Sequence, residues 1–438
     1  MRVDLRGKPA SELRPGELAG VLPRAELDVE AALETVRPVC DDVRRRGAAA
    51  VREHTARFDG VDLPSSRVPR QALDNALAEL DPGVRAALQE AARRARLVHR
   101  AQVPPEHMTT VAPGSTVTER YVPVGRAGVY VPGGLVAYPS SVVMNVIPAQ
   151  AAGVAEIAVA SPPQAGSAAN NDAGLPHPVV LAACALLGIT EVHAAGGAQA
   201  IAMLGYGTAD CAPVDVITGP GNVYVAAAKR VLRGVVGTDG EAGPTEVAII
   251  ADDTADPRHV AADLVAQAEH DELAACLLVT TAAALADRVD AELRDQVTAT
   301  RHRDRVQKAL AGQSACVLVD NEDAALAVSD AWAPEHLEIQ ARDAAKLAAR
   351  VTNAGAVFAG PYAPVSLGDY LAGSNHVLPT GGTARHTSGL SVFPFLRLVN
   401  VIECDRETLA ATAPLIDALG GAEDLAAHVQ AVRVRVES

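Results

Sequence analysis

The stretch AADLVAQAEHD, residues 261–271, carries two side chains that can bind a metal ion. Leu264 and Val265 give it an apolar stripe, so we expect a helix. Gln267 and His270 are three residues apart, which places them ~60° apart around a helix axis and lets both face one cleft. An imidazole is a good zinc ligand and an amide oxygen is a less common one. On this stretch alone, an exposed helix end is the favoured interpretation, and the residues described next change that balance.

A second polar segment, residues 360–390, is rich in glycine and proline and carries Asp369 and His376. Both residue types are found as metal ligands. A connection of this length without secondary structure is uncommon in a compact domain unless it serves a function. We therefore expect Gln267, His270, Asp369 and His376 to share one site, although their spacing does not decide which of the four bind metal.

The sequence APEH places Glu335 beside His336, and such a pair can act as an acid and a base. Pro334 suits the first turn of a helix, so both residues are expected near a helix start. An isolated pair of this kind usually lies on the surface, and on these two residues alone that interpretation is favoured. Near the C-terminus, Glu423 and His428 lie ~140° apart around a predicted helix, and on spacing alone both are expected to be exposed.

Strand, glycine-rich turn and helix alternate along two stretches of the chain, 121–242 and 243–358. This pattern predicts an α/β fold with two similar Rossmann-like domains and mainly parallel sheets, a small N-terminal arm and a helical C-terminal tail. The turns PGG, GGAQ and GPGN let backbone N–H groups approach an anion at a helix N-terminus. None of them matches the dinucleotide fingerprint, and ordinary strand–helix turns also use glycine.

These elements suggest four parts of the chain. The arm covers residues 1–28, one α/β domain combines 29–128 with 243–388, the other covers 129–242, and the tail covers 389–438. The domain that combines 29–128 with 243–388 would carry the candidate metal and acid/base residues. The polar loop 161–178 is predicted to be an insertion that lies away from the site.

Composition narrows the classes of partner. With 438 residues, 49% hydrophobic and 21% charged, the chain is a typical globular protein of several domains. A net charge of −15 argues against nucleic acid and anionic membrane. Six separated cysteines give neither thiolate zinc spacing nor a disulfide framework. The N-terminus lacks an apolar signal region and no apolar run reaches membrane length, so we expect a cytoplasmic protein.

In combination, these segments resemble the histidinol dehydrogenase family over nearly the whole chain. The motifs that carry the resemblance are YVPGG (130–134), GGAQAIA (196–202), GPGN (219–222), AGPTEV (242–247), QAEHD (267–271), APEHLEI (333–339) and GDYLAGSNHVLPT (368–380). The resemblance implies an NAD-dependent enzyme with one zinc ion per subunit. It would oxidise L-histidinol to L-histidine through L-histidinaldehyde, in two hydride transfers that complete histidine biosynthesis.

The resemblance also implies a role for individual residues. The metal ligands would be Gln267, His270, Asp369 and His428. The substrate contacts would be Thr245, Gln267, His270, His336, Asp369, His376, Glu423 and His428. The NAD contacts, on the 129–242 domain, would be Tyr130, Gln199 and Asn222. Glu335 and His336 would be the catalytic residues, with His336 as the base and Glu335 activating water.

The resemblance implies a homodimer in which the tail of each chain contributes to the partner's site. His428 would then be a ligand supplied by the partner, and His376 would contact substrate instead of metal. Many relatives have serine where this chain has Thr245, and the hydroxyl is kept.

Two other classes remain as alternatives. In a zinc hydrolase without a nicotinamide cofactor, Glu335 would activate metal-bound water, which leaves the three glycine turns without a role. A non-catalytic binding protein would need no acid/base pair. We rank the dehydrogenase first.

Overall fold

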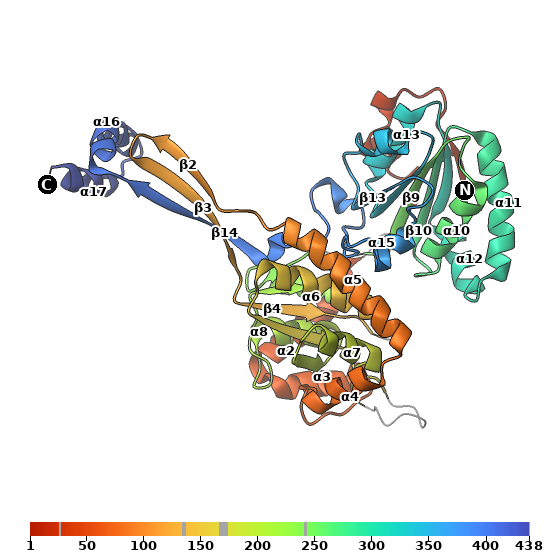
Figure 1. Ribbon diagram of the computed structural model, residues 1–438, viewed down its shortest axis with the longest axis horizontal. Coiled ribbons are helices and arrows are strands. Elements are labelled where there is room, and N and C mark those ends of the chain that lie inside the picture. Colours follow the sequence, from red (N-terminus) through yellow and green to blue (C-terminus); the bar gives the residue numbers. More distant parts are fainter. Residues whose placement is uncertain (26–27, 134–136, 166–173, 241–242, 438) are drawn as a thin grey trace.

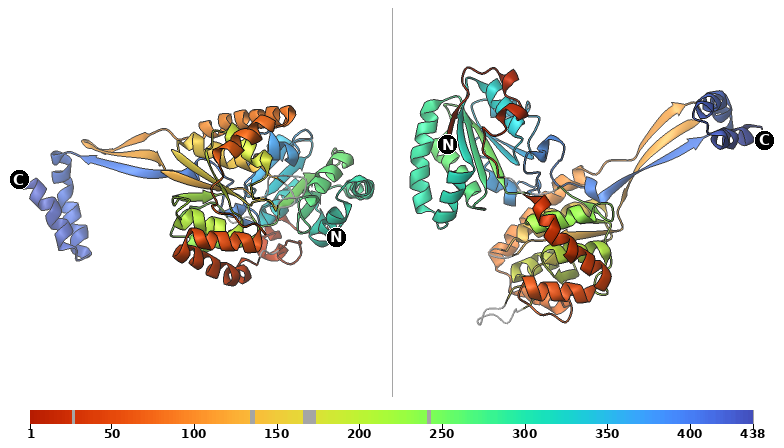
Figure 2. Two further views of the ribbon diagram at one scale, coloured as in Figure 1. Left: turned by 90° about the horizontal axis from the view of Figure 1, so that it is seen from below. Right: turned by 180° about the vertical axis from the view of Figure 1, so that it is seen from behind.

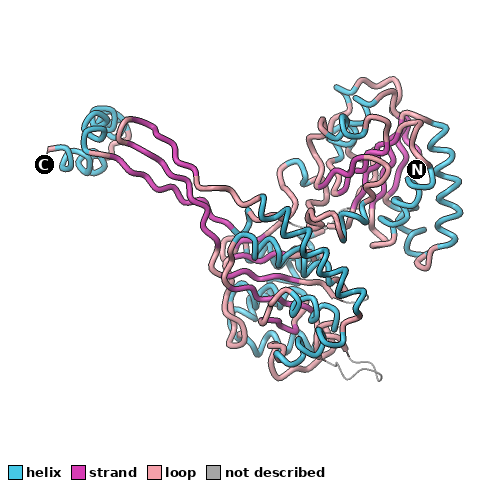
Figure 3. Tube along the Cα trace, viewed as in Figure 1, coloured by secondary structure: helices cyan, strands magenta, loops and turns pink. Residues whose placement is uncertain are grey.

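The computed structural model describes residues 1–25, 28–133, 137–165, 174–240 and 243–437. Two α/β units lie beside each other, and a long arm extends from one of them and ends in the two C-terminal helices (Figure 1). In each unit a sheet is flanked by helices (Figure 3). No helix in the described ranges is long and apolar enough to cross a membrane.

Five parallel strands form the sheet of the first unit, in the order β6-β5-β4-β7-β8. The strands are β4 (Arg126–Tyr130), β5 (Glu156–Ser161), β6 (Glu191–Ala194), β7 (Val216–Thr218) and β8 (Gly237–Thr238). Parallel neighbours need a crossover, which a helix usually supplies. The helices between them are α6 (Pro139–Ala152), α7 (Pro178–Leu186), α8 (Gly197–Tyr206) and α9 (Val223–Leu232).

Six parallel strands form the sheet of the second unit, in the order β1-β11-β10-β9-β12-β13. The strands are β1 (Arg2–Asp4), β9 (Glu246–Ala251), β10 (Ala275–Thr280), β11 (Ser314–Leu318), β12 (His336–Gln340) and β13 (Ala356–Ala359). The helices are α10 (Pro257–Ala268), α11 (Ala283–Ala299), α12 (Arg303–Gly312), α13 (Glu322–Trp332), α14 (Ala344–Ala348) and α15 (Val365–Tyr370). Two similar units with parallel sheets confirm the predicted fold class.

The arm is a three-stranded antiparallel sheet in the order β14-β3-β2. Its strands are β2 (His107–Ala112), β3 (Ser115–Pro123) and β14 (Leu396–Cys404), and the tail helices α16 (Arg406–Ala422) and α17 (Ala426–Val436) follow. These helices lie at the far end of the arm, away from both α/β units in every view (Figure 2).

The helices of residues 29–101 pack differently from our prediction, which grouped 29–128 with 243–388. They are α2 (Val29–Arg46), α3 (Ala48–Phe58), α4 (Arg70–Glu79) and α5 (Pro82–Ala101). The apolar faces of α2 and α3 join one face of the five-stranded sheet with α8 and α9, and α4 and α5 join the other face with α6 and α7. Residues 107–123 belong to the arm. An apolar stripe shows that a helix has a buried face and leaves open which sheet covers it.

The predicted N-terminal arm is part of the second unit. β1 adds a parallel edge strand beside β11, and the short segments η1 (Ala10–Glu12) and α1 (Pro15–Leu18) follow. Leu5, Leu13 and Leu18 are buried in the same core as the apolar residues of α13. The 3-10 turns η2 (Thr383–Arg385) and η3 (Phe393–Phe395) lie before β14, where Phe395 is buried against α6 residues of the first unit.

Candidate active site

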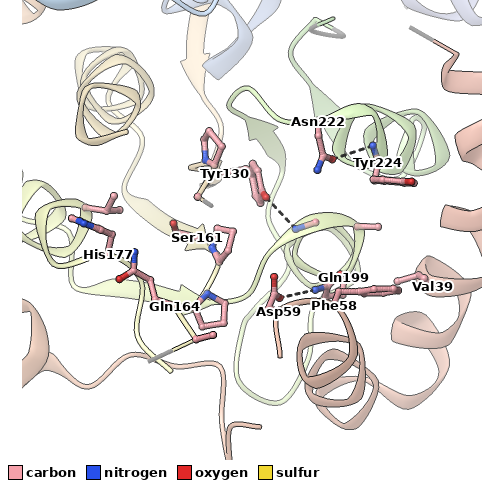
Figure 4. Close-up of a pocket in the computed structure, with 18 of the residues that line it drawn as sticks. Val39, Phe58, Asp59, Tyr130, Ser161, Gln164, His177, Gln199, Asn222 and Tyr224 are labelled. Atoms are coloured by element: carbon pink, nitrogen blue, oxygen red, sulfur yellow. Dashed lines mark hydrogen bonds between the residues drawn. The ribbon is translucent and has the colours of Figure 1, made fainter. Parts of the chain in front are cut away.

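A cavity of about 740 Å³ lies at the carboxyl ends of the five-stranded sheet (Figure 4). Tyr130 ends β4, Ser161 ends β5, and Gly197 begins α8, and all three line this cavity. The strand order reverses between β4 and β7, which is where ligands of open parallel sheets bind.

The three residues expected to contact NAD lie together in this first cavity. The Tyr130 hydroxyl accepts a hydrogen bond from the backbone N–H of Gly197 at 3.1 Å, and burial raises its pKa to about 12. Asn222 Oδ1 accepts from the N–H of Tyr224 at 3.1 Å and so caps α9. Gln199 Nε2 donates to Asp59 Oδ2 at 3.2 Å (Figure 4).

One glycine of these turns is required by packing. Gly219 has a φ of +121°, and a Cβ there would lie 2.0 Å from the backbone oxygen of Tyr130. The GPGN turn therefore uses glycine to let the chain pass close to β4, whether or not a ligand binds.

A second cavity, of about 700 Å³, lies between the two α/β units. Six residues expected at the active site line it: Thr245, His270, Glu335, His336, Asp369 and His376. Pro132, Gly133 and Asn222 line both cavities, so the two spaces adjoin.

Gln267 and His270 lie at the C-terminus of α10. The helix ends at Ala268, so His270 stands in the turn that follows it and not within a helix as expected. Gln267 is 2% exposed, and its Nε2 donates to Thr245 Oγ1 at 2.6 Å. Gln267 Oε1 is buried without a hydrogen-bond partner among the described residues. Asp369, on α15, brings its Oδ2 to 3.9 Å from His270 Nε2.

Glu335 is buried beside Thr245. Thr245 Oγ1 donates to Glu335 Oε2 at 2.6 Å, and the N–H of Glu246 donates to the same oxygen at 2.8 Å. Burial raises the pKa of Glu335 to about 7. A carboxyl group with this pKa exchanges protons readily near neutral pH.

His336 opens strand β12, so the expected helix start at this position is wrong. α13 ends at Trp332, and Ala333 adopts a left-handed φ of +52° that turns the chain back into the sheet between β9 and β13. His336 Nδ1 lies 2.9 Å from the backbone oxygen of Glu246 and must donate to it, which leaves Nε2 as the basic nitrogen. Burial lowers the pKa of His336, so the ring is neutral at neutral pH.

His376 lies in the polar loop that links the two units. Its Nδ1 donates to the backbone oxygen of Asp369 at 3.0 Å, and burial lowers its pKa. Its Nε2 lies 3.5 Å from Ser141 Oγ on α6. The neighbouring Asn375 donates from Nδ2 to the backbone oxygen of Met144 at 2.6 Å. The loop predicted to serve a site thus docks one unit on the other.

Glu423 and His428 are not brought to this site within one chain. Both are exposed, Glu423 at the end of α16 and His428 in α17. These helices lie at the tip of the arm (Figures 1 and 2).

The 161–178 loop was expected to lie away from the site, and its described ends contradict this. Ser161, Gln164 and His177 line the first cavity, while 166–173 lie outside the described residues. Sequence reasoning also missed Phe58 and Asp59, which line the same cavity. A signal was available for the loop, because it follows a predicted strand at its carboxyl end, as the glycine turns do.

A further cluster of potential ligands lies at the amino end of β6. Glu191, His193 and Cys211 have ligand atoms within 4.8 Å of one another. Glu191 already pairs with Arg126 at 2.6 Å and with Arg67 at 3.0 Å. This ion-pair network accounts for the cluster, which is separate from the predicted metal site.

Two Rossmann-like units whose cavities adjoin beside a buried carboxyl–imidazole pair define a two-domain α/β enzyme. The family model of histidinol dehydrogenase matches residues 22–436. Histidinol dehydrogenases from Thermobifida fusca (strain YX) and Streptomyces avermitilis are 61% and 59% identical to this chain, and each match covers 99% of this chain and 97% of the relative. The crystal structure of histidinol dehydrogenase from Elizabethkingia anophelis superimposes with a TM-score of 0.92 at 32% identity, covering 100% of this chain and 98% of that one.

The chain therefore belongs to the histidinol dehydrogenase family. It is an oxidoreductase of histidine biosynthesis.

Proposed function

We propose that this protein oxidises L-histidinol to L-histidine through L-histidinaldehyde, with NAD as the hydride acceptor and one zinc ion per subunit. The observation that carries the proposal is the shared wall of the two cavities, formed by Pro132, Gly133 and Asn222. A cofactor in the first cavity can present its reactive ring to a substrate in the second. A hydrolase without nicotinamide would leave the first cavity without a role.

The first cavity fits a dinucleotide. Its volume of about 740 Å³ lies within the range of cofactor sites, and it lies where the strand order reverses. Phe58 and Tyr224 line it with exposed aromatic rings on which a base can stack. Asp59 adds a carboxyl group, which favours a ribose hydroxyl over a 2′-phosphate and therefore NAD over NADP.

The donor set in the second cavity fits zinc. The buried Gln267 Oε1 needs a partner, and bonds of ~2.0–2.2 Å allow one ion to reach both atoms of the 3.9 Å pair His270 Nε2 and Asp369 Oδ2. When bound, zinc supplies a positive charge that holds the imidazole and amine of histidinol and orients its carbinol carbon. The ligands would be Gln267, His270, Asp369 and His428 of the partner subunit.

The chain's own residues supply the proton chemistry. The His336 ring is neutral, and its proton is on Nδ1, which donates to the backbone oxygen of Glu246. Nε2 can therefore accept the substrate hydroxyl proton as hydride leaves the carbinol carbon. Glu335, held by Thr245, can accept a proton from the water that hydrates the aldehyde before the second transfer. His376 and Thr245 line the space where the substrate would lie.

A second copy of the chain would cover the arm. Large apolar side chains are exposed along the arm and on the tail helix α16: Met108, Val111, Ile402, Leu415 and Leu419. Exposed apolar surface of this extent marks an interaction site. In a symmetric dimer, the partner's arm would bring Glu423 and His428 to the half-exposed His270.

The test is to mix the purified protein with L-histidinol and NAD and to follow NADH by its absorbance. We expect two NADH per histidinol, loss of turnover after chelation, and recovery with zinc. Absence of NADH with a zinc-loaded, folded protein would contradict the proposal.

A further inference from the structure

A buried and a half-buried carboxyl group lie close together behind the proposed metal ligands. Glu338 on β12 is 1% exposed, and the half-buried Asp263 on α10 lies close enough for one amide to donate to both carboxyl groups. Gln340 Nε2 donates to Asp263 Oδ2 at 2.8 Å and to Glu338 Oε2 at 3.1 Å. The N–H of Val365, the first residue of α15, donates to Glu338 Oε1 at 2.8 Å. The pair thus joins α10, β12 and α15.

Two carboxyl groups that share one amide donor lie close together, and their like charges repel when both are ionised. The surrounding donors are amides, and His259 on α10 is a further titratable group that acts on Asp263. Burial and the charge of Asp263 raise the pKa of Glu338, and burial raises the pKa of Asp263. The pair therefore holds one proton at neutral pH.

Each of the three joined elements also carries a residue of the proposed site, about one helical turn or two strand residues away from this pair. On α10, Gln267 is one turn beyond Asp263, and on α15, Asp369 is one turn beyond Val365, so each lies ~6 Å along its helix. On β12, His336 lies two residues before Glu338, on the same face of the sheet and ~6.6 Å away. The contacts of the pair therefore hold the elements from which ligands and base project.

We propose that Asp263 and Glu338 are positioning residues that fix α10 against α15, so that Gln267, His270 and Asp369 meet at one metal ion. The inference rests on the proposed zinc site. An apolar pair would fill the same space with a smaller desolvation cost, which indicates that these carboxyl groups serve more than packing. Hydrogen bonds are directional, so each contact of the polar pair sets the orientation of one of the joined elements.

Two variants of one residue test the proposal on the full-length protein. Glu338→Gln keeps the size of the side chain, accepts from Val365 and can donate to Asp263; it gives up the hydrogen bond from Gln340, which still donates to Asp263. Glu338→Ala removes these contacts. We expect zinc to bind Glu338→Ala about 10–100-fold more weakly, the usual cost of losing an outer partner of a metal site, and to bind Glu338→Gln as it binds the unaltered protein. The measurement is competition for zinc with a chelating dye.

Alkaline pH provides a readout that a role in packing alone would not change. When the pair loses its proton, two negative charges repel, and zinc affinity should fall in the unaltered protein. Glu338→Gln cannot lose such a proton, so its zinc affinity should not fall in this way. The difference between the two proteins therefore separates the effect of the pair from effects of pH on the metal ligands. NADH binding, followed by fluorescence, should be the same in all variants.

Each outcome supports or overturns a specific part of the proposal. Zinc affinity unchanged in Glu338→Ala overturns the positioning role, and equal weakening in Glu338→Gln overturns the shared proton. Should Glu338→Ala not fold, Asp263→Ala at the half-buried side replaces it, and an unchanged zinc affinity there would equally overturn the positioning role. An unaltered protein that binds NADH but no zinc would refute the metal site itself, which distinguishes that failure from failure of the pair.

Discussion

Apart from the additional edge strand β1, the six-stranded sheet has the same strand order as the five-stranded sheet, yet the two cavities lie at opposite ends of their strands. In the five-stranded sheet, the cavity lies at the carboxyl ends, where Tyr130 ends β4 and Asn222 follows β7. In the six-stranded sheet, the site lies at the amino ends, where Glu246 begins β9 and His336 begins β12. Strand order alone therefore does not decide which end of a sheet becomes functional.

Because strands and helices alternate in both units, the two cavities meet opposite ends of the helices. α8 and α9 begin at the first cavity, and the partial positive charge of a helix N-terminus favours the phosphates of a dinucleotide. α10 ends at the second cavity beside Gln267 and His270, and the partial negative charge of a helix C-terminus favours a cation. One fold used in two directions thus suits an anionic cofactor on one side and a metal ion on the other.

The largest effect is expected at the amino-end site. His336→Asn removes the basic Nε2, and we expect NADH formation to fall by about 10²–10⁴-fold because a general base is lost. NADH binding should be unchanged. The exposed His386→Asn is the matched control and should keep full turnover. Undiminished turnover of His336→Asn would remove this residue from the mechanism.

Loss of a proposed metal ligand should weaken zinc binding in the second cavity and leave NADH binding in the first cavity unchanged. Asp369→Asn removes the charge 3.9 Å from His270, and zinc affinity should fall by more than the ~10–100-fold cost of losing an outer partner. NADH fluorescence titration should give the unaltered affinity. If the affinities for zinc and for NADH fell together, the two cavities would not bind independently.

A mixed dimer tests whether the amino-end site needs a second chain. His336→Asn and His428→Asn should each be nearly inactive, because each damages both sites of its homodimer. After subunit exchange of equal amounts, turnover should recover to about a quarter of the unaltered value, since half of the dimers then carry one intact site. No recovery, with exchange verified by mass spectrometry, would contradict shared sites.

The pH dependence of histidinaldehyde oxidation should follow the ionisation of Glu335. Because burial raises its pKa to about 7, the carboxyl group is protonated below that pH and cannot accept a proton from water. Oxidation of histidinaldehyde should therefore fall by about tenfold per pH unit as the pH drops below 7, and Glu335→Gln should be slower and lack this dependence. Persistence of the same profile in Glu335→Gln would assign it to another group.

The smallest effect is expected at the carboxyl-end cavity. Asp59→Asn removes the carboxyl group beside Gln199, and the preference for NADH over NADPH should narrow by about tenfold. Competition of the two cofactors for fluorescence measures this ratio, and zinc affinity serves as the control. An unchanged ratio would show that Asp59 supports Gln199 without selecting the cofactor.

Local structure followed from the sequence where short-range patterns decide it. Alternating strands, glycine turns and helices predicted both units, and the polar 360–390 loop indicated a site. Prediction was wrong at His336, where Pro334 suggests a helix start. Leu337 and Ile339 are instead buried in a strand between β9 and β13, because pairing with two neighbours outweighs the local preference.

Long-range packing explains the other errors. The apolar stripe of α2 specified a buried face, but only contact with α8 and α9 assigned it to the five-stranded sheet. Asp59 has no sequence pattern around it and becomes part of the cavity because α3 ends beside Gly196.

By itself, the sequence determined the donor and acid/base types, the two α/β repeats and the motifs of the family, since these depend on residue identity and short spacing. The tertiary structure alone decided that one sheet offers its carboxyl ends and the other its amino ends, and that the resulting cavities adjoin at Gly133 and Asn222. The reason is that the relative placement of two sheets depends on contacts between residues far apart in the chain, which no local pattern encodes.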